Sequence, residues 1–146
     1  MLTDLKIHSV IESLDDTGTP EGEPEINITT HRANMRRDGD ILHLSYKEEQ
    51  EGVDISCHIT VYPDGKVSLS RRGGIISDIL FSEGEECSTV YTIPPYRFDM
   101  TVSTLRVELS MCGAPIRIRI IYTMNIGGQR RRTSLTVTAG KANEAK

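Results

Sequence analysis

Short runs in which apolar and polar residues alternate fill most of the chain, and the clearest of them lies between residues 53 and 72. In its first half, apolar side chains recur at every second position: Val53, Ile55, Cys57, Ile59 and Val61. An alternation of period two is typical of a β-strand with one buried face and one exposed face. Similar runs continue almost to the C-terminus, so the pattern predicts a protein built from β-strands.

The segment Pro63-Asp64-Gly65 predicts a hairpin turn inside this run. Proline presets φ for the first turn position, aspartate tolerates the second, and glycine accepts the left-handed conformation that ends a three-residue loop. Such a loop places Ile59 opposite Leu69 and Cys57 opposite Arg71, because opposed residues share a face. Arg71 is therefore expected to point inward, together with the apolar side chains.

The remaining pattern predicts further strands, joined mostly by turns that contain glycine or proline. They lie at 6–14, 25–36, 41–47, 87–93, 97–103, 105–111, 116–126 and 130–138, with an extended or short helical piece at 75–81 and an acidic loop at 15–25. No longer segment shows helical periodicity free of glycine and proline. We expect an all-β fold with one domain at 1–138, a single antiparallel meander barrel of about 8–10 strands, and a flexible tail at 139–146.

A barrel of this size either fills its interior with side chains or holds one small ligand. If the interior is filled, Phe81, Met100, Leu105 and their neighbours are the side chains that fill it. A cavity of roughly 300 Å³ or more would favour a small-molecule ligand, and a filled interior would leave a surface interaction module.

Charge and cysteine content exclude several classes of function. The net charge is −4 and the pI about 5.6, with 14 acidic and 6 basic residues at 1–70 (−8) against 7 and 11 at 71–146 (+4). Nonspecific nucleic-acid binding by the whole surface is therefore unlikely, although a local basic patch remains possible. Cys57, Cys87 and Cys112 show no metal-ligand spacing, so we expect no metal and no cofactor. With neither a signal peptide nor an apolar span, the sequence favours a cytoplasmic protein with no membrane partner.

Several short motifs resemble those of the YwiB-like family of small bacterial proteins of unassigned function. They are Tyr46-Lys47-Glu48 at the end of one strand, Arg71-Arg72-Gly73 at the end of another, Phe81 before an acidic turn, and Tyr91 followed by Pro94. The resemblance covers 6–138 and implies a calycin-type, lipocalin-like β-barrel. The stretch at 91–96 departs from the family's Tyr-x-Thr-Pro-x-Gly run, which removes any role of that threonine and glycine.

Arg71 is the strongest candidate for a binding residue, because a guanidinium on the apolar side of a strand needs a carboxylate, an anion or water. Tyr46 and Glu48 form the polar end of an otherwise apolar strand face and are expected to meet it. His31 lies opposite Tyr46 if Asp38-Gly39 forms a two-residue turn, and Thr30 does so if a three-residue loop forms. These groups predict a ligand site at the barrel mouth, a catalytic Glu48 base, or a structural network.

Four arginines predict a basic stripe on the outer surface of the last hairpin. Arg117 and Arg119 share one face, and a two-residue Gly127-Gly128 turn puts Arg130 and Arg132 on the same face. The stripe is either a solvated face or a docking site for RNA or an acidic protein, and no aromatic side chain lies between its arginines to stack bases. Taken together, the sequence favours a noncatalytic barrel that binds a small molecule, with an anion as one option, or a protein partner of unknown identity. An enzyme and a docking module are the alternatives.

Overall fold

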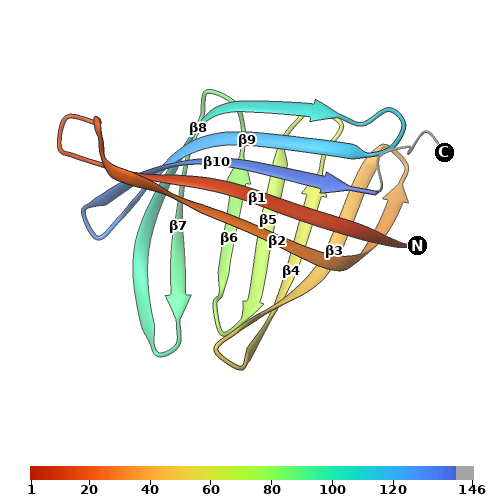
Figure 1. Cartoon of the computed structure of the whole chain (residues 1–146), viewed down its shortest axis with the longest axis horizontal. Helices are drawn as coiled ribbons and strands as arrows, with labels where there is room; N and C mark the ends of the chain where they lie inside the picture. Colours follow the sequence, from red (N-terminus) through yellow and green to blue (C-terminus); the bar gives the residue numbers. More distant parts are fainter. Residues whose placement is uncertain (141–146) are drawn as a thin grey trace.

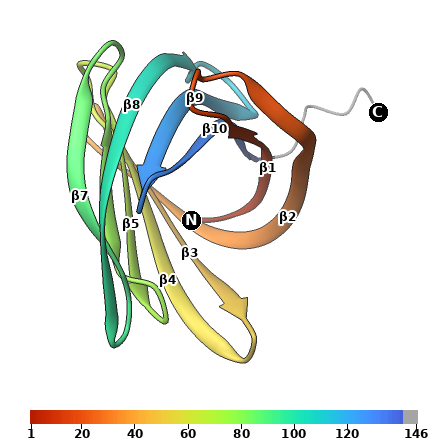
Figure 2. The ribbon, with the colours of Figure 1, turned by 90° about the vertical axis from the view of Figure 1, so that its left-hand side faces the viewer.

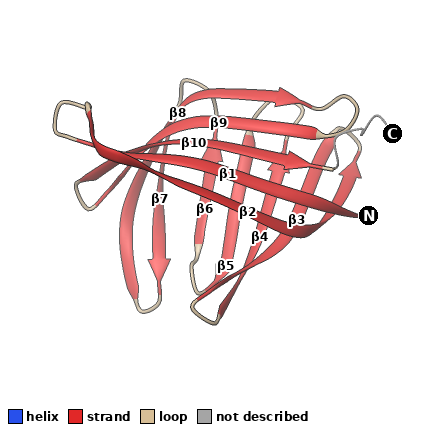
Figure 3. Ribbon diagram, in the orientation of Figure 1, coloured by secondary structure: helices blue, strands red, loops and turns tan. Residues whose placement is uncertain are grey.

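The computed structural model describes residues 1–140 and places ten antiparallel β-strands in one sheet (Figures 1 and 3). The strands are β1 (Leu2–Leu14), β2 (Pro20–Asp38), β3 (Ile41–Gln50), β4 (Val53–Val61), β5 (Val67–Gly73), β6 (Ser77–Phe81), β7 (Glu86–Ile93), β8 (Tyr96–Ser110), β9 (Ile116–Ile126) and β10 (Gln129–Ala139). The all-β meander predicted from the sequence is confirmed. The tail predicted at 139–146 lies, from residue 141 on, outside the described residues.

The strand order is β6-β5-β4-β3-β2-β1-β10-β9-β8-β7, so consecutive strands pair except β6 and β7, and β1 pairs with β10. The sheet curls until β6 and β7 meet, which leaves a nearly closed barrel (Figure 2). Ile76 and Thr92 join the two ends there through an isolated bridge, in which each backbone N–H donates to the other residue's carbonyl at 2.8 and 2.9 Å. This seam is much shorter than the ladders between the other strands.

Large apolar side chains fill the interior. Those buried most completely are Leu5, Leu42, Leu44, Ile55, Val67, Phe81, Met100, Val102, Ile118, Ile120 and Val137. They come from nearly every strand, as expected when alternate residues of each strand face a common lumen. Phe81 and Met100 are thus confirmed as filling residues.

Leu105 does not fill the lumen, and that expectation was wrong. The pairing of β8 with β9 shifts between Thr104 and Arg106, so Leu105 occupies a β-bulge and is 51% exposed. A bulge adds one residue and reverses the alternation beyond it. The two strands predicted at 97–103 and 105–111 are in fact one strand, β8, with the bulge between its two halves.

Two other boundaries differ from those predicted. β2 begins at Pro20, so the connection after β1 is short and much of the segment predicted as an acidic loop is strand. Within that connection, the Asp15 carboxylate accepts hydrogen bonds from the backbone N–H groups of Thr17 and Thr19, both at 2.9 Å. The piece predicted at 75–81 forms the strand β6 and no helix. Within the described residues, no helix is long and apolar enough to cross a membrane.

The register predicted for the β4–β5 hairpin is confirmed. The Tyr62 N–H donates to the Lys66 carbonyl at 2.9 Å, and Cys57 lies opposite Arg71. Both registers considered for the β2–β3 hairpin were wrong. Asp38 pairs with Ile41, so the turn is Gly39-Asp40 and not a loop centred on Asp38. Left-handed backbone at Gly39, with φ of 63°, is what such a tight turn needs.

β2 and β3 pair only next to their turn, through residues 34–38 of β2, and then separate (Figures 1 and 2). Within the described residues, 46–50 of β3 pair only with β4, and β2 continues from residue 33 back to Pro20 with β1 as its only partner, interrupted by a bulge at 22–24. The gap between these unpaired edges opens one end of the barrel. We call it the barrel mouth.

Candidate functional site

A row of four inward-facing residues crosses the sheet beside the barrel mouth. Tyr46 of β3 lies opposite Cys57 of β4, Cys57 lies opposite Arg71 of β5, and Arg71 lies opposite Ser77 of β6. Directly opposed antiparallel residues hold their Cβ atoms about 5 Å apart. The four side chains therefore form one continuous strip, which the sequence predicted only as far as Cys57 and Arg71.

Arg71 and Ser77 each hold a buried polar atom that has no hydrogen-bond partner within residues 1–140. These atoms are the Nε of Arg71 and the Oγ of Ser77, and the Ser77 side chain is only 1% exposed. An unsatisfied buried polar group costs about 1–3 kcal/mol, so native proteins generally provide a partner. Two such groups side by side indicate a place that a small polar ligand or a water completes.

Glu48 lines the same cavity as Arg71, but the two side chains form no ion pair. None of the ion pairs within 4.0 Å in the described chain involves Arg71. Glu48 Oε1 instead accepts a hydrogen bond from the Tyr46 hydroxyl at 3.3 Å. Tyr46, Glu48 and Arg71 thus line one cavity, but only Tyr46 and Glu48 are joined by a hydrogen bond.

The electrostatics of the strip keep Arg71 charged and its neighbours neutral. Burial is the largest single influence and acts to lower the pKa of Arg71, but the electrostatic effects of Glu48, Tyr46, Cys57 and Tyr122 together outweigh it, so the pKa is raised. Burial raises the pKa of Tyr46 and that of the Cys57 thiol, and in both cases Glu48 adds to the rise while Arg71 opposes it. One fixed cation therefore faces the lumen beside the neutral Tyr46 and Cys57 side chains and the Glu48 carboxylate.

A cavity of about 40 Å³ lies against this strip. Tyr46, Glu48 and Arg71 are its polar lining, and apolar residues such as Ile118 and Leu135 form the rest. Pockets for whole small molecules usually measure about 300–1,000 Å³. The lumen therefore has room for a group of a few atoms and not for a complete ligand.

His31 lies at the rim of the mouth and does not line the cavity. Its ring packs against that of Tyr46 with centroids 4.9 Å apart and planes tilted by 41°, and its Nε2 is 3.0 Å from the Thr29 hydroxyl. The contact with Tyr46 forms although the predicted register was wrong, because the pairing of Asn34 with Ser45 leaves His31 on the same face as Tyr46 and diagonally across from it. His31 thus links the two edges of the mouth.

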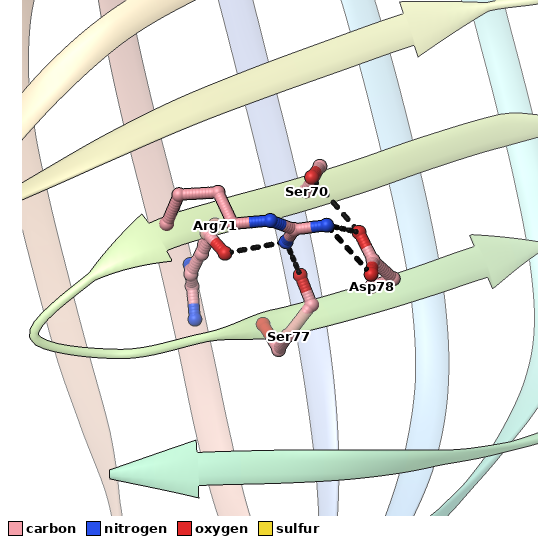
Figure 4. Close-up of polar contacts among 5 residues, drawn as sticks. Ser70, Arg71, Ser77 and Asp78 are labelled. Carbon is pink, nitrogen blue, oxygen red and sulfur yellow. Dashed lines mark hydrogen bonds and ion pairs between the residues drawn. The ribbon is translucent and has the colours of Figure 1, made fainter. Parts of the chain in front are cut away.

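The neighbouring residue Arg72 behaves differently. Its exposed side chain donates to both carboxylate oxygens of Asp78 at 3.0 and 2.9 Å, and also to the carbonyls of Arg71 and Ser77. Ser70 donates a further bond to Asp78 at 2.8 Å (Figure 4). In this cluster Arg71 contributes only its backbone carbonyl.

The arginines predicted as an outer stripe share the outer face of β9 and β10. The Gly127-Gly128 turn has two residues as predicted, and Arg117 and Arg119 are exposed between inward isoleucines. Acidic side chains interrupt the stripe: Glu108 is 3.6 Å from Arg119, and Glu12 is 3.0 Å from Arg132. Arg130 lies farther along, beside an open hollow whose lining also includes Asp15, Asp16 and Glu21.

Sequence reasoning missed a chain of hydrogen bonds on the outer face of β3 and β4. The Nδ1 of His58 is 3.0 Å from the Ser45 hydroxyl, and its Nε2 is 3.0 Å from the Nδ1 of His43. The register set by the turn at Glu51-Gly52, which places Ser45 opposite His58, was the available signal. Within residues 1–140, no group of three or more histidine, cysteine or acidic side chains could hold a metal ion.

Comparison with known proteins gave one family and one fold. The profile of a family described as a domain of unknown function (DUF1934) matches residues 13–136. Among solved structures, the chain is similar to the crystal structure of the ywiB protein from Bacillus subtilis, with 21% identity, a TM-score of 0.75, and coverage of 96% of this chain and 94% of that chain. No curated protein matched. The likeness shows a shared fold and confirms the resemblance to YwiB-like proteins.

Proposed function

Starting from the fact that the chain belongs to the DUF1934 family, whose description names no activity, we propose that it is a noncatalytic binding module. It recognises a carboxylate group at the barrel mouth through Arg71. The group is carried by a small ligand or a protein partner that stays mostly outside the barrel. The cysteines Cys57, Cys87 and Cys112 are free thiols, which suits the reducing cytoplasm that we propose for it.

One observation carries this proposal: the guanidinium of Arg71 faces a cavity with its Nε buried and unpartnered. Guanidinium groups bind carboxylates through two parallel hydrogen bonds, and such charge-assisted bonds are stronger than those between neutral groups. A water would satisfy the N–H but would leave the charge without a contact partner. The buried Ser77 hydroxyl lies opposite Arg71 but does not line the cavity, so Arg71 is the group that meets the ligand.

Size and charge both select a singly charged group. The cavity of about 40 Å³ accepts a carboxylate and excludes the body of a ligand. Glu48 lines the same cavity, and its negative charge disfavours a phosphate dianion more strongly than a carboxylate. Tyr46, held by its bond to Glu48, closes the side of the cavity next to β3.

An acid–base enzyme with Glu48 as the base is the second candidate. The hydrogen bond from Tyr46 to Glu48 favours it, since a base and an orienting group stand within reach of each other. Against it, the cavity leaves little room for a substrate to react. Burial also raises the pKa of Tyr46, which keeps that hydroxyl protonated and unable to act as a base.

The test uses formate as probe and the ¹⁵N-resolved NMR signal of the Arg71 Nε–H as readout. We expect this signal to shift in a saturable way as formate is added, while phosphate at the same ionic strength has a much weaker effect. Glu48→Gln should tighten formate binding several-fold, because it removes a competing negative charge. A shift that stays linear in formate would contradict the proposal.

Arg72 offers a matched control on the next residue of the same strand. Arg71→Met should abolish formate binding, whereas Arg72→Met, which changes an exposed ion pair with Asp78, should leave it unchanged. Equal loss in both variants would mean that formate senses only the general charge of this region. The proposal would then be wrong.

A further inference from the structure

The long strand β2 has one free edge, and we propose that this edge pairs with the same edge of a second copy of the chain to form a dimer. Within the described residues, residues 20–21 and 25–33 of β2 pair with β1 on one side, residues 22–24 form a bulge, and the segment meets no strand on its other side. Every second residue of such an edge offers an unpaired backbone N–H and C=O, which is a template for an added strand.

This edge lacks most of the devices that prevent strand addition. Natural proteins protect exposed edges with lysines, prolines or short strands. The segment 21–33 contains no lysine, and its only proline, Pro24, lies near one end. Ile26 and Ile28 are 59% and 58% exposed on the outer face of this unprotected strand. An added strand would cover part of both side chains.

The charges along the edge favour an antiparallel copy of the same segment. The first half carries Glu21, Glu23 and Glu25, and the second half carries His31 and Arg32. An antiparallel pair brings the acidic half of one copy beside the basic half of the other, whereas a parallel pair would oppose like charges. The edge is therefore complementary to itself in one orientation.

The same orientation also matches the apolar side chains. If two copies pair symmetrically about Asn27, Ile26 of each copy lies opposite Ile28 of the other, and Glu25 of each copy lies diagonally across from His31 of the other. Opposed residues of an antiparallel pair share a face, so all four isoleucines meet on the outer face. A two-fold axis through Asn27 uses one patch on both copies, as in most homodimers.

The interface built by one strand from each copy is small, so a weak and concentration-dependent dimer is expected. Sedimentation velocity over micromolar to millimolar concentrations should show the dimer fraction rising with concentration. Ile28→Lys should weaken the dimer about tenfold or more, because it places two ammonium groups at the centre of the pair. Leu105→Lys changes a leucine on the β8 bulge that is about as exposed as Ile28, and it should leave the dimer unchanged.

A disulfide tests the two-fold axis directly. In a Cys87→Ser, Cys112→Ser background, Asn27→Cys should form a covalent dimer under mild oxidation, because the two thiols face each other across the axis. Ser88→Cys, at an exposed position on β7, is the control and should cross-link far more slowly.

Equal rates of cross-linking for the two cysteine variants, or a dimer that Ile28→Lys does not weaken, would overturn the proposal. So would a parent chain that stays monomeric throughout, and the edge would then be left to a strand of another protein. Arg71→Met should not alter dimerisation, which separates this proposal from the carboxylate site.

Discussion

Arg71 and Ser77 lie directly opposite each other on β5 and β6, and each holds a buried polar atom without a hydrogen-bond partner. Such a pair lowers the stability of the folded chain and gains a partner only when something binds. Such a site lowers the stability of the free protein and strengthens the binding of a ligand that supplies the missing hydrogen bonds.

Replacing the buried cation should therefore not destabilise the protein. We expect Arg71→Met to raise the free energy of unfolding by about 1 kcal/mol, because an apolar side chain of similar length removes the unsatisfied group. Arg72→Met should lower it by less than about 1 kcal/mol, the usual worth of an exposed ion pair. Urea unfolding of both variants measures this. A loss of more than about 2 kcal/mol in Arg71→Met would mean a structural role for the guanidinium.

The outer histidine pair should make stability depend on pH. Burial lowers the pKa of His58 below 6.5, and the nearby charges of His43 and Arg36 lower it further. The unfolded chain then binds the proton more tightly, so this contribution to stability is complete above pH 6.5 and is lost as the pH falls through the lower folded value. His58→Gln should flatten the dependence of unfolding free energy on pH in this window. An unchanged slope in the variant would contradict the assignment.

Two apolar residues test the position of the β8 bulge. Phe81 is fully buried and its ring lies 4.8 Å from that of Tyr122, so Phe81→Ala should cost about 3–5 kcal/mol. Leu105→Ala should change the unfolding free energy by less than about 0.5 kcal/mol, because the side chain is mostly in solvent. Thermal and urea unfolding of the two variants give the comparison. A large effect of Leu105→Ala would place that residue inside the lumen after all.

Gly73 should tolerate no side chain. Its φ is 134°, and a Cβ there would overlap the carbonyl oxygen of Asp54 on β4. Gly73→Ala should therefore cost more than about 2 kcal/mol and also weaken formate binding, since Arg71 precedes it by two residues. Gly84→Ala is the control: its φ of 79° is also left-handed, but a Cβ there meets nothing within 4 Å. It should cost only about 1 kcal/mol. An equal loss of unfolding free energy in the two variants would mean that backbone strain, and not the overlap with Asp54, sets the cost at Gly73.

The arginine stripe should not bind RNA. Arg119 and Arg132 are already paired with Glu108 and Glu12, which leaves a broken pattern of positive charge. We expect no retention on immobilised RNA or heparin at low salt. The variant with Arg117, Arg119, Arg130 and Arg132 changed to serine should elute with the parent. Retention that falls steeply with salt and disappears in the variant would establish the docking function.

The sequence predicts well what local pattern and turn chemistry determine. The three-residue turn at Pro63-Asp64-Gly65 set the register that places Cys57 opposite Arg71, and two glycines set the β9–β10 turn. The β2–β3 turn was misplaced because Asp38-Gly39 and Gly39-Asp40 both contain a glycine that suits a tight turn. A shift of this kind changes every pairing along the strand.

Features that depend on distant strands were beyond the sequence. The bulge at Leu105 arises from pairing with β9. The apolar positions do change phase there, from Met100 and Val102 to Leu105 and Val107, but that change reads equally well as a break between two separate strands. Ser77 was missed as a site residue because β6 could not be distinguished from a short helix. The small volume of the cavity also follows from the packing of all the inward side chains together.

The strand order has a consequence for how the chain assembles. Strands β1–β6 form one uninterrupted meander and β7–β10 form a second, and the β1–β10 ladder together with the short seam joins them. Most pairings within each meander are local in sequence and close early, whereas that ladder unites residues more than a hundred positions apart and must form late. Two separate polypeptides, divided at the connection between Phe81 and Glu86, would each keep all of their hairpins and could recombine into the complete barrel.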